Sequence, residues 1–432
     1  MSKKTITPGG GVEGVVELPG DKSISHRYAI LSALAEGQSE IANYASAADC
    51  RSTLECLRQL GVPIEYKDRT VRIAGAGLGG LKQARRALDA ENSGSTMRML
   101  AGVVAGQSFS TTLTGDESLR RRPMKRVAEP LRQMGATIRA ADGDRAPIEI
   151  QGGNLRAIDY TPPIPSAQVK SAILLAGLYA DGVTTVHESV CTRDHTELAL
   201  RGFGAKVEGQ RGIIRIHPRP KLTGRRLSVP GDLSSAIFLI AAALILSDSS
   251  VMIHNVGLNP TRARVLDFLI SIGAKIHVPS LQSRDGELVG DVAVQHAPLL
   301  GGNVSGAQVA EMIDELPMLA ALGPFTEQGI EIHDAQELRV KESDRIATLA
   351  AGLRQMGAKV EEFPDGMRVE GKSAGKLRGA KVDPQGDHRI AMALSVAALG
   401  AEGETVLRDA DCVGVSFPEF FTILDRLRGQ EK

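Results

Sequence analysis

Two apolar patterns alternate along the chain and predict its helices and strands. The first is a helix-length run of small apolar residues that opens with a cluster of polar groups. A short β-branched segment follows each run, and this composition predicts a strand. Six copies occur, at residues 21–37, 91–106, 165–182, 230–248, 314–329 and 386–403.

The second pattern is the end of a helix, followed by a glycine and a β-prone run. A glycine at this point suits the left-handed residue that closes many helices. In most copies a hairpin follows, most clearly at 363–371, where Asp365 and Gly366 predict the turn. A further copy near Leu424 stops as the sequence ends. The glycines recur about every 70 to 85 residues, at Gly61, Gly135, Gly204, Gly273 and Gly357.

Together these patterns predict six copies of one α/β unit of about 70 residues. Six units suggest two lobes of three, and the dipeptide Gly-Asp occurs in the same frame at 20–21 and 231–232. We therefore expect one lobe from residues 21–230 and the other from residues 1–20 plus 231–432. The chain would cross between the lobes near 20–21 and 230–232, and two crossings would make a hinge.

Composition narrows the class of protein. Apolar residues make up 42% of the 432 residues, enough for sizeable cores, but aromatic residues make up only 3%. The formal net charge of zero argues against a nucleic-acid or membrane-surface partner, which would favour a basic excess. Four irregularly spaced cysteines, without a CxxC pair, favour reduced thiols in a cytoplasmic protein. The N-terminus lacks the apolar segment of a signal peptide, and no run is long enough to span a bilayer.

The polar groups at the helix starts suggest a site. Ser, Asn and Asp there are ordinary N-caps, which explains about half of the pattern. Capping does not explain cations, because a positive side chain at a helix N-terminus opposes the helix dipole unless an anion is shared. If the helix starts point to one place, they form an anion-binding cleft between two lobes. The unexplained cations are Lys22, Arg27, Arg98 and Arg389.

Other polar groups have both a structural and a functional interpretation. The run at 120–122 would more often be a solvated surface cluster. In Lys341-Glu342-Ser-Asp-Arg345 the spacing fits an exposed salt-bridge array on a helix about as well as a site. Asp314 could be a simple cap, or a carboxylate that takes a proton. No phosphate-binding glycine loop, metal-spaced histidine pair or GxSxG motif is present, so spacing alone does not name the reaction.

Eight motifs occur in the order seen in the 5-enolpyruvylshikimate-3-phosphate synthase family. They are PGDKSISHR, NSGSTMR, RRRPM, PSAQVKSA, TRDHTE, IDELP, RVKESDR and GDHRIAMA, and the resemblance runs from about Gly11 to Phe421. SAQVKSA and TRDHTE resemble the class II bacterial enzymes. The resemblance implies an α/β fold of two domains, an inverse α/β barrel or prism with three βαβαββ units in each.

The resemblance also implies a reaction and roles for residues. Phosphoenolpyruvate and shikimate 3-phosphate would give 5-enolpyruvylshikimate 3-phosphate and phosphate, without a metal or organic cofactor. Lys22, Asp314 and Glu342 would handle protons. The implied shikimate 3-phosphate ligands are Lys22, Ser23, Arg27, Ser166, Ala167, Gln168, Arg193, Asp314 and Lys341. The implied phosphoenolpyruvate ligands are Lys22, Asn92, Gly94, Arg122, Gln168, Arg345 and Arg389.

The sequence departs from the family at one position, and at another it keeps the glycine that is replaced in some glyphosate-resistant members. Class I members, and some others, carry a Lys shortly before the C-terminal Phe-Pro motif, but residues 412–418 contain none, so one phosphate contact is missing or replaced. Gly94 is retained where some class II enzymes that resist glyphosate carry Ala. We therefore expect glyphosate to compete with phosphoenolpyruvate.

Two rival functions remain at this point. The related transferase that acts on UDP-N-acetylglucosamine usually carries a catalytic Cys in a loop that here reads 115–123 and has none. A non-catalytic repeat protein that binds phosphorylated ligands or RNA ends would avoid the carboxylates Asp314 and Glu342. We expect a monomeric cytoplasmic enzyme of aromatic amino acid biosynthesis that acts on small molecules.

Overall fold

The chain forms two compact units. The computed structural model describes residues 2–210 and 212–430. The N-terminal unit comprises Gly20–Val229 and Arg284–Glu287, and the C-terminal unit comprises the residues up to Pro19, Pro230–Ser283 and those from Leu288 onward. Each unit has its own core of buried apolar side chains. Within the described residues, no helix has the length and apolar character needed to cross a membrane.

The N-terminal unit contains three four-stranded sheets of one design. In each, a parallel edge pair is extended by an antiparallel hairpin. In sheet order, the strands are β14 (Arg226–Ser228), β3 (Glu36–Ala42), β5 (Thr70–Ala76) and β4 (Ile64–Lys67); β6 (Leu88–Asp89), β7 (Ser110–Thr114), β9 (Arg145–Gln151) and β8 (Thr137–Ala141); and β10 (Asp159–Tyr160), β11 (Thr184–His187), β13 (Ile213–Ile216) and β12 (Val207–Gln210).

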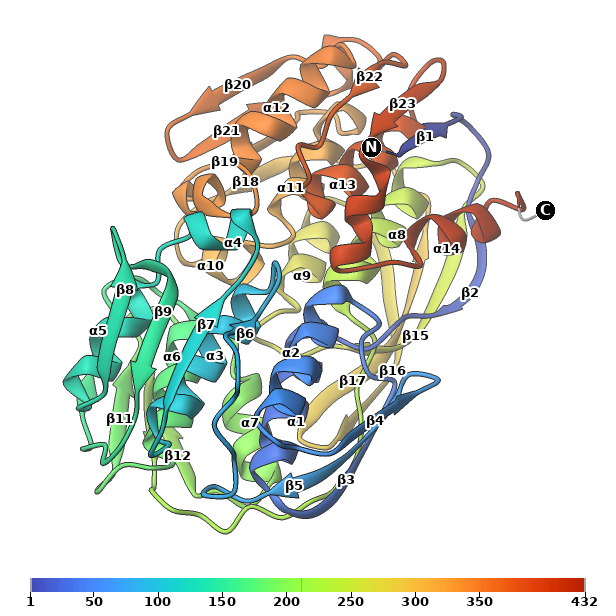
Figure 1. The fold of residues 1–432 in the computed structure, drawn as a ribbon. Coiled ribbons are helices and arrows are strands. Elements are labelled where there is room, and N and C mark those ends of the chain that lie inside the picture. The colour runs from blue at the N-terminus through green and yellow to red at the C-terminus, as the bar shows by residue number, and fades with distance from the viewer. Residues whose placement is uncertain (1, 211, 431–432) are drawn as a thin grey trace. The chain divides into compact units, whose positions relative to one another are not determined.

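The C-terminal unit contains two such sheets and a third of three strands. In the third sheet the first strand of the chain, β1, takes the antiparallel position beside β23 (Figure 1). In sheet order, the strands are β18 (Gly302–Val304), β19 (Ile330–Ile332), β21 (Gly366–Val369) and β20 (Val360–Phe363); β16 (Lys275–Arg284), β17 (Glu287–Gln295), β15 (Ser250–Gly257) and β2 (Glu13–Glu17); and β1 (Lys3–Ile6), β23 (Thr405–Arg408) and β22 (Lys381–Val382).

One helix in each repeat is buried on nearly all sides, as its uniformly apolar sequence predicts. All twelve residues of α13 are buried. Small residues let these helices approach closely, and a Cβ on Gly102 would collide with the backbone of Ala172 on a neighbouring helix. The inner helices are α1 (Lys22–Leu34), α3 (Gly94–Ala105), α6 (Ala167–Gly177), α8 (Leu233–Ile245), α11 (Leu316–Leu322) and α13 (His388–Leu399).

The second helix of each repeat is amphipathic and ends at a left-handed glycine. The φ angles of the five predicted glycines lie between 86° and 107°, and Gly429 after the last helix has a φ of 66°. The predicted α/β class and the recurring order of strands and helices are therefore present. These helices are α2 (Ala48–Gln59), α5 (Lys125–Gln133), α7 (His195–Gly202), α9 (Arg264–Ser271), α12 (Arg345–Gln355) and α14 (Phe420–Leu427), with the short α4 (Glu117–Arg121) and α10 (Ala307–Met312) outside the pattern.

One detail of the expected domain division is corrected. Residues 284–287 were expected in the C-terminal lobe, but they belong to the N-terminal unit. There the Glu287 carboxylate lies 2.7 Å from Nδ1 of buried His195, and Asp285 accepts a hydrogen bond from the Ser228 backbone. Contacts between residues so far apart in sequence leave no local signal.

Candidate active site

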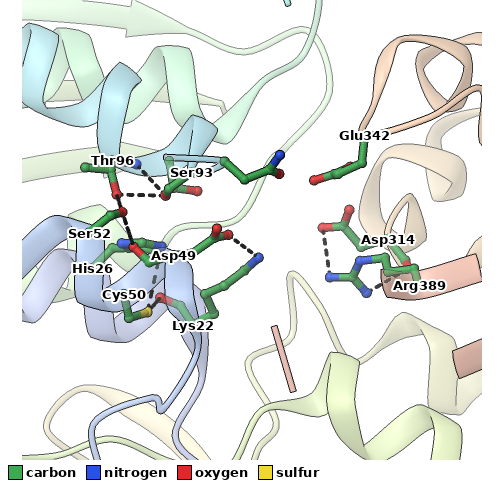
Figure 2. A network of polar contacts seen from close by, with 12 residues as sticks. Lys22, His26, Asp49, Cys50, Ser52, Ser93, Thr96, Asp314, Glu342 and Arg389 are labelled. Carbon is green, nitrogen blue, oxygen red and sulfur yellow. Dashed lines mark hydrogen bonds and ion pairs between the residues drawn. The ribbon is translucent and has the colours of Figure 1, made fainter. Parts of the chain in front are cut away.

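The candidate residues form two groups, one in each unit. Figure 2 shows members of both groups as sticks. The N-terminal group is Lys22, Ser23, Arg27, Asn92, Gly94, Arg122, Ser166, Ala167, Gln168 and Arg193, and the C-terminal group is Asp314, Lys341, Glu342, Arg345 and Arg389.

The starts of the three inner helices of the N-terminal unit are capped as the sequence predicts. Asp21 accepts a hydrogen bond from the Ile24 N–H at 2.9 Å, and Ser93 accepts one from the Thr96 N–H at 3.1 Å. Ser166 caps α6 with a longer bond of 3.4 Å. Other N–H groups of a first turn have no acceptor within the helix and can bind an anion.

Lys22 opens α1 and pairs with a carboxylate that the sequence analysis missed. Its Nζ lies 2.6 Å from Oδ2 of Asp49, and the two side chains are 17% and 9% exposed (Figure 2). Asp49 lies in the first turn of α2, where the helix dipole favours an acid. This pairing offsets the unfavourable position of a cation at the start of α1. The only signal in the sequence that could have pointed to Asp49 is its position as an acidic residue in the first turn of α2.

Hydroxyl groups connect the starts of α1 and α3 beneath Lys22. Nδ1 of His26 lies 2.6 Å from the Thr53 hydroxyl, which lies 2.6 Å from the Thr96 hydroxyl. Thr96 in turn donates to Ser93 at 2.7 Å (Figure 2). Burial, together with the charges of Lys22 and Arg27, lowers the pKa of His26 well below its usual value. His26 is therefore neutral at pH 7 and contacts the Thr53 hydroxyl.

Arg27 is held by neighbouring side chains in a buried position. Its Nε donates to the Thr196 hydroxyl at 2.6 Å, and its Nη2 donates to the Ser171 hydroxyl at 2.8 Å. Nη1 donates to the Ser23 carbonyl at 2.7 Å. Burial lowers the pKa of Arg27 to about 10, and the positive charge of nearby Arg193 contributes to that decrease. Arg27 remains charged at pH 7 and presents a fixed cation.

Of the three consecutive arginines at 120–122, only the last is buried. Arg121 pairs with Glu117 on the surface, as the solvated-run interpretation predicts. Arg122 is 8% exposed, and its Nη2 donates to Asn92 at 3.0 Å. Asn92 donates to Asp116 at 2.7 Å. The buried Arg122 therefore belongs with the candidate site.

Gly94 and Gln168 share a neighbour, Arg98, that was not among the predicted ligands. Nη1 of Arg98 donates to Gln168 at 2.6 Å, and Gln168 donates to the Ser95 hydroxyl at 2.9 Å. A Cβ on Gly94 would lie 2.5 Å from Nη1 of Arg98 and 3.6 Å from Nη1 of Arg122. A side chain at this position would therefore push against the arginines.

In the C-terminal unit, three carboxylates surround Arg345, which is 1% exposed. Its Nε donates to Asp387 at 2.8 Å, its Nη2 donates to Glu342 at 2.6 Å, and its Nη1 lies 3.6 Å from Asp314. Burial opposes the charge of Arg345, but these carboxylates raise its pKa above its ordinary value. Burial also favours protonated Asp387, yet Arg345 holds the pKa of that carboxyl below its usual range.

The salt-bridge interpretation of residues 341–345 is partly corrected. Glu342 and Arg345 do pair, but the pair is buried or nearly so, with side chains 17% and 1% exposed. It does not lie on a helical face, because α12 begins only at Arg345, with Asp344 as its N-cap. The interpretation of residues 341–345 as an exposed salt-bridge array on a helix was therefore wrong.

Asp314 lies among three cations. Its carboxylate is 3.6 Å from Arg345, 3.9 Å from Arg389 and 4.0 Å from Nζ of Lys341. Arg389 also donates to the Asp314 carbonyl at 2.9 Å, as Figure 2 shows. The capping interpretation is wrong, because α11 begins at Leu316 with Glu315 as its N-cap. A carboxylate in this position can accept a proton from a bound substrate.

The segment that lacks the family Lys holds a neutral thiol. Burial raises the pKa of Cys412, in the 3-10 helix Ala410–Val415, to about 12. Cys412 therefore supplies no charge to a phosphate. In the part of the chain that the structure describes, no three His, Cys, Asp or Glu side chains are grouped to hold a metal ion.

Comparisons with known proteins agree over nearly the whole chain. A family model described as EPSP synthase (3-phosphoshikimate 1-carboxyvinyltransferase) matches residues 6–424. The 3-phosphoshikimate 1-carboxyvinyltransferase of Solibacter usitatus is 54% identical over 424 residues, 98% of this chain and 99% of that protein. The protein of the same name from Koribacter versatilis is 50% identical over 427 residues, 99% of each chain.

Solved structures are similar to this chain over nearly its whole length. EPSP synthase from Acinetobacter baumannii superposes with a TM-score of 0.88 at 39% identity, covering 99% of this chain and 98% of that one. The enolpyruvyl transferase NikO from Streptomyces tendae has a TM-score of 0.79 at 19% identity, covering 98% of this chain and 96% of that one. The second likeness concerns the fold alone.

Proposed function

Because the chain belongs to the EPSP synthase family, we propose that it transfers the enolpyruvyl group of phosphoenolpyruvate to the 5-hydroxyl of shikimate 3-phosphate. The observation that carries the proposal is the Asp314 carboxylate with three cations within 4.0 Å. A site built only to bind anions would avoid a carboxylate there. The arrangement suits a reaction that must hold anions and also move a proton.

The proposed reaction is an addition followed by an elimination. Asp314 takes the proton of the 5-hydroxyl while the hydroxyl oxygen forms a bond to C2 of phosphoenolpyruvate. Lys22 and Glu342 handle the proton that joins the methylene carbon, which gives a tetrahedral intermediate. The C2–O bond to phosphate then breaks, and the new methyl group loses a proton to restore the double bond. Arginines stabilise the charge on the departing phosphate.

The proposed ligands follow the two groups of candidate residues. Both substrates are anionic and repel each other at contact distance, so several cations are needed to hold them together. For shikimate 3-phosphate we propose Lys22, Ser23, Arg27, Ser166, Ala167, Gln168, Arg193, Asp314 and Lys341. For phosphoenolpyruvate we propose Lys22, Asn92, Gly94, Arg122, Gln168, Arg345 and Arg389.

Phosphate release tests this function directly. The purified protein should release phosphate when both substrates are mixed, and none with either substrate alone. The product should be 5-enolpyruvylshikimate 3-phosphate by mass spectrometry. Binding of both substrates without release would instead support a non-catalytic anion binder. We further propose that the enzyme acts in the cytoplasm, as a monomer, in the route to aromatic amino acids. Light scattering of the pure protein would measure its mass and so test the monomeric state.

Gly94 makes a prediction about inhibition. With no side chain at this position, glyphosate should compete with phosphoenolpyruvate, with an inhibition constant similar to the KM of that substrate. In Gly94→Ala the new methyl would lie 2.5 Å from Arg98 and displace its guanidinium, so glyphosate should bind at least about tenfold more weakly. Inhibition assays at several phosphoenolpyruvate concentrations measure both constants. A wild-type inhibition constant far above the KM would contradict the prediction.

A further inference from the structure

A fully buried lysine lies beneath the proposed shikimate 3-phosphate ligands without being one of them. Lys170 is on α6, two residues after Gln168, and its side chain is 1% exposed. A buried ammonium group is expensive unless its three donors are satisfied. Lys170 lies within the motif PSAQVKSA, which also contains Ser166, Ala167 and Gln168. A role for its charge near these residues is therefore expected.

All three donors of Lys170 have acceptors. Its Nζ lies 2.7 Å from Oε1 of Glu197 and 3.1 Å from Oε2 of Glu188. It also donates to the Thr192 carbonyl at 3.3 Å. The cluster thus holds two carboxylates and one ammonium, and both glutamate side chains are less than 10% exposed. Burial raises the pKa of Glu197, and Lys170 is the main group that opposes this increase.

Glu188 links Lys170 to the loop between β11 and α7 through its contacts with Thr192. Its Oε1 accepts a hydrogen bond from the Thr192 backbone N–H at 3.1 Å and another from the Thr192 hydroxyl. Thr192 is therefore held at its N–H, its hydroxyl and its carbonyl, the last by Lys170 itself. The next residue is Arg193, a proposed ligand of shikimate 3-phosphate.

The same cluster also adjoins the supports of Arg27. Ser171 follows Lys170, and Thr196 precedes Glu197. The hydroxyls of Ser171 and Thr196 lie 2.6 Å apart, and each accepts a hydrogen bond from Arg27. Residues flanking the cluster thus fix Arg27, a second proposed ligand of shikimate 3-phosphate.

We propose that Lys170 is a positioning residue for shikimate 3-phosphate: by clamping Glu188, Glu197 and the Thr192 carbonyl, it holds Arg193 and Arg27 where they bind this substrate. This inference rests on the proposed function. It assigns Lys170 no contact with substrate, and its effect is specific to one of the two substrates.

The experiment uses two variants of the full chain. Lys170→Met removes the charge but leaves two buried carboxylates unpaired, so it tests the cluster only if it folds. Glu188→Gln is milder, because the amide keeps the shape of the side chain but replaces one of two acceptor oxygens with a donor. Glu208→Gln, an exposed acid of the same unit with a side chain 49% exposed, is the matched control.

Binding of shikimate 3-phosphate is measured by calorimetry, together with kcat and the KM for each substrate. Loss of one charged hydrogen bond should weaken shikimate 3-phosphate binding in Glu188→Gln by about tenfold. The KM for phosphoenolpyruvate and kcat should stay within about twofold, and Glu208→Gln should match wild type. Lys170→Met, if folded, should show the same selectivity with a larger loss.

Other outcomes separate the two proposals. Equal increases in the KM values for both substrates, or lower thermal stability with unchanged binding, would mean a purely structural cluster and would overturn the positioning role. Failure of the wild-type protein to bind shikimate 3-phosphate would overturn the proposed function itself, before any variant is compared.

Discussion

At the residue scale, the proposed base can be tested by removing its charge while keeping its shape. Asp314→Asn cannot accept the hydroxyl proton, so kcat should fall by at least about 100-fold. Binding of both anionic substrates should persist, because the three cations near residue 314 remain and no longer pair with the Asp314 carboxylate. Steady-state phosphate release measures kcat and KM, and exposed Asp267→Asn serves as the control. A rate near that of wild type would assign the base to another group.

Buried His26 makes stability depend on pH. Burial and two neighbouring cations lower its pKa well below the value of about 6.5 that it has in the unfolded chain. Below about pH 6.5 the unfolded chain binds a proton that the folded protein does not, so stability falls as the pH falls, until the folded pKa is reached. The slope from this one group is at most about 1.4 kcal/mol per pH unit.

His26→Gln isolates this contribution. Gln can still bond to the Thr53 hydroxyl, but it does not titrate. Urea unfolding between about pH 7.5 and about pH 5.5 should therefore show a flatter pH dependence for the variant than for wild type. Identical slopes would mean that other buried groups cause the acid sensitivity.

The cations of the site could be predicted from local sequence, but most of their partners could not. Lys22 and Arg389 stand out because a cation at a helix start is unfavourable by itself. Asp49, which pairs with Lys22, lies 27 residues further along the chain, and only the fold brings the two together. Arg98 appeared as an unexplained cation, and its bond to Gln168 spans 70 residues.

At the element scale, the helix-ending glycines should matter through their backbone. Gly357 has a φ of 90°, and a Cβ there would find only the Lys376 carbonyl, at 4.0 Å. Gly357→Ala should therefore lower stability by about 1 kcal/mol through the left-handed conformation alone. Gly414→Ala is the control, because nothing lies within 4 Å of its Cβ and its φ is not positive. Equal urea midpoints for the two variants would contradict this explanation.

The repeat was readable from sequence because its signals are local. Apolar runs, caps and left-handed glycines each fall within one helix and the strand beside it. The start of α12 was misjudged because Lys341, Glu342 and Arg345 have helical spacing, although the helix begins only at Arg345. Three carboxylates around Arg345 determine that geometry, and one of them is Asp387, from the next repeat.

At the scale of the whole molecule, the last repeat is completed by the first strand of the chain. Among the described residues, five sheets have a parallel edge pair extended by an antiparallel hairpin, but the sheet of β22 and β23 gains β1 instead of a hairpin. The register pairs Lys3 with Arg408 and Ile6 with Thr405. The position of β1 could not be predicted from the local pattern, because the pairing joins residues about 400 positions apart.

This pairing predicts that a change near the N-terminus will destabilise the C-terminal unit. Ile6 is 4% exposed within the core of that unit, so Ile6→Ala should lower its stability by about 2–5 kcal/mol. Thr5→Ala alters the exposed side of the same strand and should have little effect. Limited proteolysis in increasing urea, with fragments identified by mass, should show the C-terminal unit cleaved first in Ile6→Ala. Because Gly20–Val229 has a separate core, that segment should resist as in wild type, and equal loss of both units would contradict the separate cores.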